Sequence, residues 1–83
     1  MILPGQVEVS SVYNGIVKPS LYTLGVAENF SIVIKALTNF SVDRIRFFDE
    51  TPRRMALIHV QYNDEFVVPV SEKVFMRLKM EGH

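Results

Sequence analysis

Apolar and polar residues alternate through residues 42–71, and this alternation is the clearest structural signal in the chain. Successive side chains of a β-strand point to opposite faces of a sheet, so alternation predicts strands with one buried face. The pattern divides into three segments, which read VDRIRFFDE, MALIHVQYN and EFVVPVS. We therefore predict a three-stranded antiparallel meander over this part of the chain.

Two loops set the register of the predicted meander. A four-residue loop at 51–54 pairs Ile45 with Val60, and a three-residue loop at 63–65 pairs Val60 with Val68. A two-residue turn at the second position would put the apolar sets on opposite faces, whereas three-residue hairpin loops are common and keep them together. The inner face then consists of Ile45, Phe47, Ile58, Val60, Phe66, Val68 and Val70.

The same register defines an outer face that mixes apolar and basic side chains. Arg46 is expected opposite His59 on this face, and Phe48 opposite Leu57. The face is too apolar for solvent alone and too basic for a core. Its members are Arg44, Arg46, Phe48, Leu57, His59, Gln61, Val67 and Pro69.

The N-terminal segment predicts a β-hairpin. Residues 6–13 alternate in part, Asn14-Gly15 is a strong turn signal, and Ile16-Val17 begin a return strand. Pro19 limits the return strand because proline has no N–H to donate to a ladder.

Residues 28–40 fit two patterns. The spacing of an amphipathic helix is met by Phe30, Val33, Ile34, Leu37 and Phe40. One face of a strand would consist of Phe30, Ile32, Ile34 and Ala36, and the β-branched residues favour it. The length of the segment and the five matches favour a helix with Asn29 as N-cap, which is the prediction adopted.

Residues 71–82 predict a closing helix. Ser71 is a suitable N-cap, Glu72 suits the first turn, and Gly82 is a suitable stop. The predicted order is therefore an N-terminal β-hairpin, a helix, a three-stranded antiparallel meander and a C-terminal helix. Helices on one face of an antiparallel sheet form a two-layer sandwich, so the expected class is α+β in a single domain over residues 1–83.

Size and charge favour association over a strongly electrostatic partner. The chain has 83 residues, no cysteine, and nine basic against nine acidic residues. Small domains without disulfides often gain stability by associating, and a zero net charge argues against bulk duplex DNA or an anionic membrane. Only four of the eighteen charges lie in residues 1–41. Two interpretations stay open: this half is a partner or self-association surface, or it is buried within the domain.

No secretory or membrane-spanning segment is recognised in the sequence, so the expected location is cytoplasmic, with no membrane partner.

The sequence offers few parts for catalysis. It contains two histidines, His59 and the terminal His83, and no phosphate-binding glycine loop, nucleophile elbow or spaced metal-ligand set. In the predicted register Arg46 faces His59, which disfavours the imidazolium, and no carboxylate orients the ring. We therefore expect a non-enzymatic protein with no cofactor and no metal site.

Two binding hypotheses compete for the outer face. Arg44 and Arg46 alternate with Phe48 beside His59 and Gln61, and the adjoining loop carries Arg53 and Arg54. Arginines and aromatic rings on an open sheet can hold phosphates and stack unpaired bases, which favours RNA or single-stranded DNA. The competing interpretation is that the hairpin or a second subunit covers Phe48 and Leu57.

Protein binding explains more of the sequence. Phe48, Leu57 and Val67 would form the centre of an interface. Its rim would consist of Arg44, Arg46 and Gln61. The leading hypothesis is a non-enzymatic interaction or regulatory module that self-associates as a homodimer or larger assembly, or binds another protein. Its binding surfaces would be the hairpin half and the outer sheet face. The alternative is RNA or single-stranded-DNA binding through that face.

Overall fold

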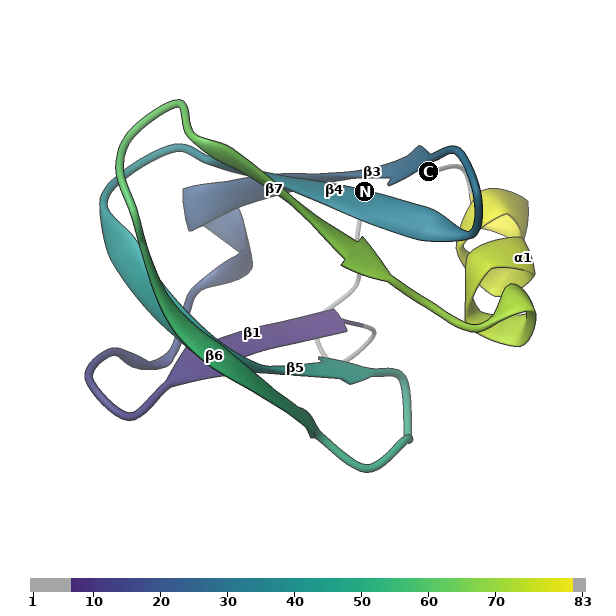
Figure 1. The fold of residues 1–83 in the computed structure, drawn as a ribbon, viewed down its shortest axis with the longest axis horizontal. Coiled ribbons are helices and arrows are strands. Elements are labelled where there is room, and N and C mark those ends of the chain that lie inside the picture. The colour runs from purple at the N-terminus through teal and green to yellow at the C-terminus, as the bar shows by residue number, and fades with distance from the viewer. Residues whose placement is uncertain (1–6, 82–83) are drawn as a thin grey trace.

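The structure, a computed structural model, describes residues 7–81 as two antiparallel β-sheets that face each other, with one α-helix across an end (Figure 1). The first sheet has the strand order β2-β1-β5-β6, and the second has the order β3-β4-β7. The strands are β1 (Val7–Ser11), β2 (Gly15–Ile16), β3 (Tyr22–Ala27), β4 (Ser31–Ala36), β5 (Phe40–Phe47), β6 (Arg53–Val60) and β7 (Glu65–Pro69). The helical segments are a 3₁₀ turn, η1 (Pro19–Leu21), and the α-helix α1 (Glu72–Met80).

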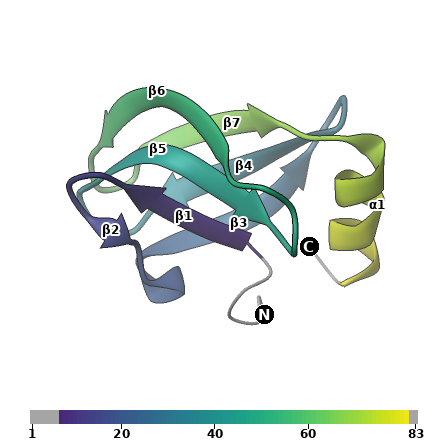
Figure 2. The ribbon, with the colours of Figure 1, turned by 90° about the horizontal axis from the view of Figure 1, so that it is seen from below.

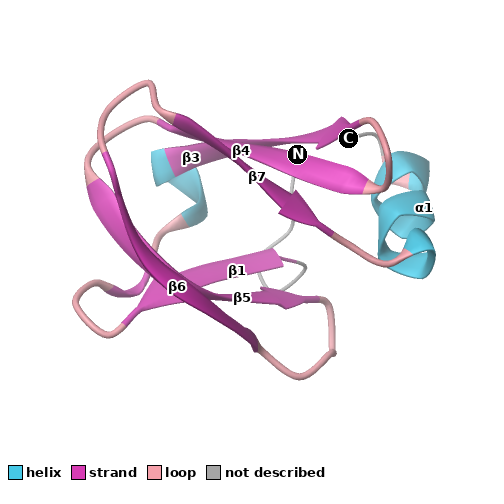
Figure 3. Cartoon of the chain, viewed as in Figure 1, coloured by secondary structure: helices cyan, strands magenta, loops and turns pink. Residues whose placement is uncertain are grey.

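The α+β prediction is wrong, because the described chain is mostly strand and its single α-helix is C-terminal (Figure 3). The predicted helix at 28–40 is wrong. This segment contains the turn of the β3–β4 hairpin, where Asn29 and Phe30 have positive φ angles of 58° and 52°, followed by β4 and the connection to Phe40, the first residue of β5. Alternation is the pattern that the fold uses there, since Ile32, Ile34 and Ala36 are fully buried. The rejected strand interpretation was therefore the better one for these three residues.

The predicted meander is also wrong. β5 and β6 do pair, but β7 joins β4 in the other sheet and does not pair with β6. The turn after β6 brings the chain to Ala36, whose N–H donates to the Asp64 carbonyl and whose carbonyl accepts from Asn63 N–H, both at 2.8 Å. Alternation identifies a strand but does not determine which strand pairs with it. Here the hydrogen bonds to Ala36 place the start of β7 beside β4 in the second sheet.

The register of β5 against β6 differs from the prediction. Phe40 pairs with Val60 and Val42 with Ile58, whereas Ile45 pairs with Arg53. A bulge lies between these two registers, where residues 55–57 of β6 lie opposite the single residue Asp43. A bulge changes which residues share a face, so no single register describes the pair.

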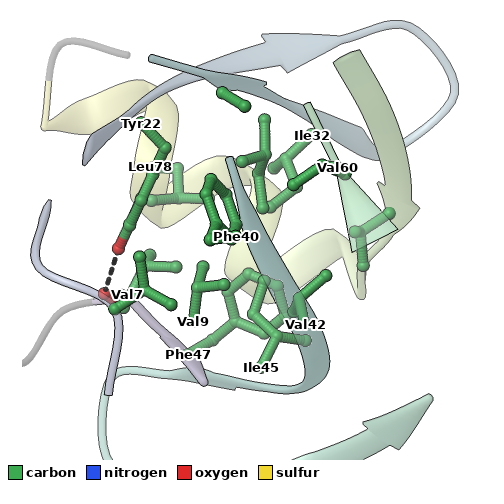
Figure 4. Packing of buried hydrophobic residues seen from close by; sticks show 14 of the residues in the cluster. Val7, Val9, Tyr22, Ile32, Phe40, Val42, Ile45, Phe47, Val60 and Leu78 are labelled. Carbon is green, nitrogen blue, oxygen red and sulfur yellow. Dashed lines mark hydrogen bonds between the residues drawn. The ribbon is translucent and has the colours of Figure 1, made fainter. Parts of the chain in front are cut away.

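The residues predicted for the inner face nevertheless belong to the core. Ile45, Phe47, Val60 and Val68 are buried, and Ile58, Phe66 and Val70 pack against them. Two sheets contribute these residues instead of one meander (Figures 2 and 4). Valines of β1, isoleucines of β4 and Leu78 of α1 complete the same core (Figure 4).

The two terminal predictions fare better. β1 and β2 form the predicted hairpin, but it turns at residues 12–14 and not at Asn14-Gly15, because Ser11 pairs with Gly15, whose φ is +60°. Ser71 caps α1 as expected, because its Oγ accepts a hydrogen bond from Val74 N–H at 3.2 Å. The predicted stop at Gly82, together with residues 1–6 and His83, lies outside the described residues. Within residues 7–81, no helix has the length and hydrophobicity that a bilayer crossing requires.

Candidate functional site

Three connections gather at the end of the sandwich opposite α1: the β1–β2 loop, the β4–β5 connection and the β6–β7 turn (left in Figure 1). Side chains tie them to one another. Asn14 Oδ1 accepts a hydrogen bond from Ser41 N–H at 2.6 Å, and Asn39 Oδ1 accepts one from Tyr62 N–H at 2.8 Å. Connections that are fixed in this way on a rigid scaffold are common sites of binding.

The β1–β2 loop is held in one conformation by Ser11. The Ser11 hydroxyl is buried and accepts hydrogen bonds from the backbone N–H groups of Tyr13 (3.2 Å) and Asn14 (2.8 Å). Its Oγ also lies 3.3 Å from Asn14 Oδ1, to which it donates. The tip therefore presents Val12 and Tyr13 to solvent from an ordered loop.

Ser41 and His59 form a polar pair beside this loop. They are cross-strand partners on the outer face of the first sheet, and Ser41 Oγ lies 2.8 Å from His59 Nδ1. The ring of Tyr13 stacks on His59 with 6.2 Å between centroids. Ser41 is only 9% exposed, and among residues 7–81 no carboxylate hydrogen-bonds the histidine. The pair thus orders the surface and supports the Tyr13 ring.

Two shallow depressions adjoin the pair. One, of about 370 Å³, is lined by Asn14, Asn39, Phe40, Ser41, His59, Val60 and Gln61. The other, of about 310 Å³, is lined by Asn14, Ile16, Val17, Lys18, Leu21, Asn39 and Phe40. They share Asn14, Asn39 and Phe40, so together they form one uneven surface across the end of the sandwich.

Large apolar side chains stand exposed around these depressions. Val12, Tyr13, Ile16 and Tyr62 are between 67% and 71% exposed, and Leu37 is 43% exposed. We call these five residues, with the depressions between them, the loop-end surface. Four of the five belong to the charge-poor N-terminal half, whose remaining apolar residues include much of the core. That half is thus partly buried and partly exposed at this end.

The basic residues predicted for the outer face do share it. Glu8 pairs with Arg46, Ser10 with Arg44 and Arg44 with Arg54, so these side chains leave the same face of the first sheet. His59 leaves that face farther along β6. Arg46 Nη2 lies 2.7 Å from Glu8 Oε2, and Arg44 Nε lies 3.1 Å from Asp43 Oδ1. Acidic neighbours that the predicted register did not place here therefore offset two of the arginines.

Phe48 is not part of the outer face. It is 6% exposed, has a φ of +55°, and lies under α1, where the Arg77 guanidinium is 3.9 Å from its ring centroid. The strand ends at Phe47, so the alternation that would point Phe48 outward no longer applies. The interface centre predicted from Phe48 with Leu57 and Val67 is not assembled, since Val67 lies in the other sheet.

The remaining predicted residues are scattered. Leu57 is half-exposed within the bulge of β6, and Gln61 lies in the β6–β7 turn, where its N–H donates to Asp64 Oδ2 at 2.9 Å. Arg53 turns away from Arg54 and donates from Nη1 to the Pro69 carbonyl of the second sheet. Of the eight predicted site residues, Arg44, Arg46 and His59 leave the predicted face. The predicted loop at 51–54 is wrong for its arginines, because Arg53 and Arg54 begin β6, and Arg54 joins the outer face as the partner of Arg44.

The hairpin half was predicted as a binding surface, but sequence reasoning did not name the individual residues of the loop-end surface. The Asn14-Gly15 signal located the hairpin, but the bond from Asn14 to Ser41 joins segments 27 positions apart. A signal was present in the apolar pair Val12-Tyr13, which directly precedes the turn. Turns are usually polar, so apolar residues at a turn point to contact with something.

Within residues 7–81, no group of three or more histidine, aspartate or glutamate side chains lies close enough together to hold a metal ion. Comparisons with protein families, with curated proteins and with solved structures found no match.

Proposed function

We propose that this chain is a small non-enzymatic interaction module that self-associates through the loop-end surface. The observation that carries the proposal is the exposure of Val12, Tyr13, Ile16 and Tyr62, each at least 67% accessible, at one end of the sandwich. Exposed apolar side chains that cluster on a small protein mark interaction surfaces, and tyrosine is enriched in them.

Two further properties support association between copies of the chain. The formal net charge is zero, so copies meet without long-range repulsion. The loop tip is already ordered by Ser11 and Asn14, so little conformational entropy is lost when it becomes buried. A two-fold arrangement would bring the same surface of each copy together.

Sedimentation velocity across micromolar concentrations tests the proposal. The wild-type protein should shift from monomer toward dimer as concentration rises. The double variant Tyr13→Ser/Ile16→Ser should weaken association by at least roughly tenfold, because each truncation at the centre of an interface costs about 1 kcal/mol or more.

The matched control is Val67→Ser, which removes an exposed apolar side chain from β7 of the other sheet. It should associate as the wild type does, with circular dichroism confirming the fold of each variant. A monomer at every concentration, or a double variant that associates like the wild type, would contradict the proposal.

RNA or single-stranded-DNA binding remains a second candidate for a specific reason. Arg44, Arg46 and Arg54 lie on one open sheet face, and the Tyr13–His59 stack stands beside the hairpin loop of the same sheet. Glu8 and Asp43 reduce the positive charge available to a phosphate backbone, which is why this candidate ranks second.

A further inference from the structure

Two arginines lie directly opposite each other across β5 and β6. Arg44 and Arg54 are cross-strand partners beside the bulge, and both side chains leave the outer face of the first sheet. Like charges in this position repel at close range, which destabilises the pair unless something of opposite charge lies between them. An anion held between the two guanidinium groups would relieve this repulsion.

The compensation within the described chain is incomplete. Asp43 Oδ1 lies 3.1 Å from Arg44 Nε, and that is the one ion pair at this place. Among residues 7–81, Arg54 forms no ion pair, and the terminal nitrogens of Arg44 form no hydrogen bond. By contrast, the neighbouring Arg46 has Glu8 at 2.7 Å. The Asp43 carboxylate thus pairs with Arg44 alone, and within residues 7–81 no carboxylate pairs with Arg54.

Both arginines line the same pocket, of about 230 Å³, together with Val12, Asp43 and Met55. Val12 comes from the β1–β2 loop, and Met55 begins the three residues of β6 that the bulge leaves opposite Asp43. Bulges re-aim side chains and often lie next to binding sites. The pocket is therefore a concave place that both arginines line, with Asp43 as its acidic residue.

We propose that Arg44 and Arg54 bind a phosphate group in this pocket, as the compensating anion of the cross-strand pair. A guanidinium fork donates two parallel N–H bonds to phosphate oxygens, and phosphate can accept from two forks at once. The group would belong either to a small phosphate monoester or to the phosphodiester of a nucleic-acid strand. The pocket shares Val12 with the loop-end surface, but the two arginines that would bind phosphate lie outside that surface, so phosphate binding requires neither self-association nor base stacking.

Titrations followed by NMR test the site at constant low ionic strength, because salt screens such contacts. The probes are inorganic phosphate, a nucleoside monophosphate, a short single-stranded RNA, and acetate as the matched carboxylate. Phosphate should shift the Nε–Hε signals of Arg44 and Arg54, and acetate should not. A monophosphate that binds as tightly as the RNA indicates a small-molecule ligand, and much tighter RNA binding indicates a strand.

The variant Arg54→Glu separates binding from folding. It places a carboxylate opposite Arg44, so the melting temperature without phosphate should rise by a few degrees while the response to phosphate is lost. The matched control is Arg53→Gln, one residue away and directed to the other sheet, which should still bind phosphate. The variant Arg54→Gln, which removes the charge without adding a carboxylate, should weaken phosphate affinity by at least roughly tenfold.

Three results would each overturn the site: neither phosphate nor RNA shifts the Arg44 and Arg54 signals, acetate binds as well as phosphate, or Arg54→Glu binds like the wild type. Because monomeric protein is sufficient for these titrations, a failure of self-association leaves the phosphate result interpretable.

Discussion

Phe47 and Phe48 are adjacent phenylalanines that are both buried, which strand alternation alone does not allow. Phe47 points into the sandwich as the last residue of β5, whereas Phe48 adopts a left-handed conformation and lies against α1. A left-handed conformation is unfavourable for a bulky side chain, so other contacts must hold it. Here the buried ring and the Arg77 guanidinium at 3.9 Å supply those contacts.

Tyr22 is a second residue whose chemistry depends on its surroundings. Its hydroxyl is buried and donates to the Val7 carbonyl at 3.4 Å, between the two sheets (Figure 4). Burial, with a smaller contribution from the Glu8 carboxylate, raises the pKa of Tyr22 from 10.0 to about 12. The neutral phenol is thus the form that the fold requires.

This raised pKa predicts a loss of stability in alkali. Between pH 10 and pH 12 the unfolded chain releases the Tyr22 proton and the folded chain retains it. The free energy of unfolding therefore keeps its full value below pH 10 and falls as pH rises to 12, by roughly 3 kcal/mol for a shift of this size. Urea unfolding at a series of pH values measures it.

Tyr22→Phe is the control for the alkaline effect. Lysines and the other tyrosines titrate in both proteins, so the difference between the two pH profiles isolates Tyr22. The variant should lose less stability than the wild type over this range. Parallel profiles would show that ionisation of Tyr22 is not coupled to folding.

At the scale of elements, the sequence predicted correctly those features whose hydrogen bonds lie within one short segment. The Ser71 cap lies within one turn of the N–H that it accepts, and the β1–β2 hairpin closes over residues 12–14. Local signals failed at 28–40, where helical spacing and strand alternation coexist in the same residues. Tertiary packing decides between the two patterns, because the core between the two sheets buries the alternating residues Ile32, Ile34 and Ala36.

The contribution of the Ser71 cap to the free energy of unfolding can be measured. Ser71→Ala should lower the free energy of unfolding by about 1 kcal/mol, because Val74 N–H loses its acceptor. Chemical denaturation measures the change. Ser20→Ala is the matched control, since Ser20 is exposed and its side chain makes no hydrogen bond with another residue in the range 7–81; it should change stability little. Equal effects would show that the cap contributes nothing specific.

At the scale of the whole molecule, α1 is part of the single core and not an appendage. Leu78 is fully buried in the cluster that both sheets share (Figure 4). Val74, on the same helix, is buried in the same cluster. A helix packed in this way cannot leave without exposing the end of the sandwich. The helix and the sheets should therefore unfold together.

Leu78→Ala tests this coupling. The substitution should lower the free energy of unfolding by about 2–5 kcal/mol, as removal of a buried leucine does elsewhere. The control Met80→Ala changes an exposed residue of the same helix and should stay within about 0.5 kcal/mol. Fluorescence and circular dichroism should report one coincident transition; an earlier transition confined to helical signal would show that α1 is independent.

The candidate sites follow the same division between local and global causes. The arginines Arg44 and Arg46 could be placed on one face from their spacing alone, because two residues along a strand return to the same side. Their partners could not, since Glu8 and Arg54 reach them through pairing with β1 and through a bulge. The loop-end surface could not be assembled from the sequence, because it joins three connections that are distant in sequence, although the apolar pair Val12-Tyr13 marked one of them.

The amino-acid sequence by itself determined which residues are apolar at alternating positions, that a hairpin forms near Asn14-Gly15, and where the last helix begins. These properties depend on neighbours within a few residues, whose sterics and hydrogen bonds are local. Only the tertiary structure decided which strands pair, that β7 joins β4, and that Phe48 turns inward beneath α1. Those outcomes depend on how apolar surface is buried across the described residues as a whole. Several strand pairings satisfy the same alternation, so a local pattern does not select the partner of each strand.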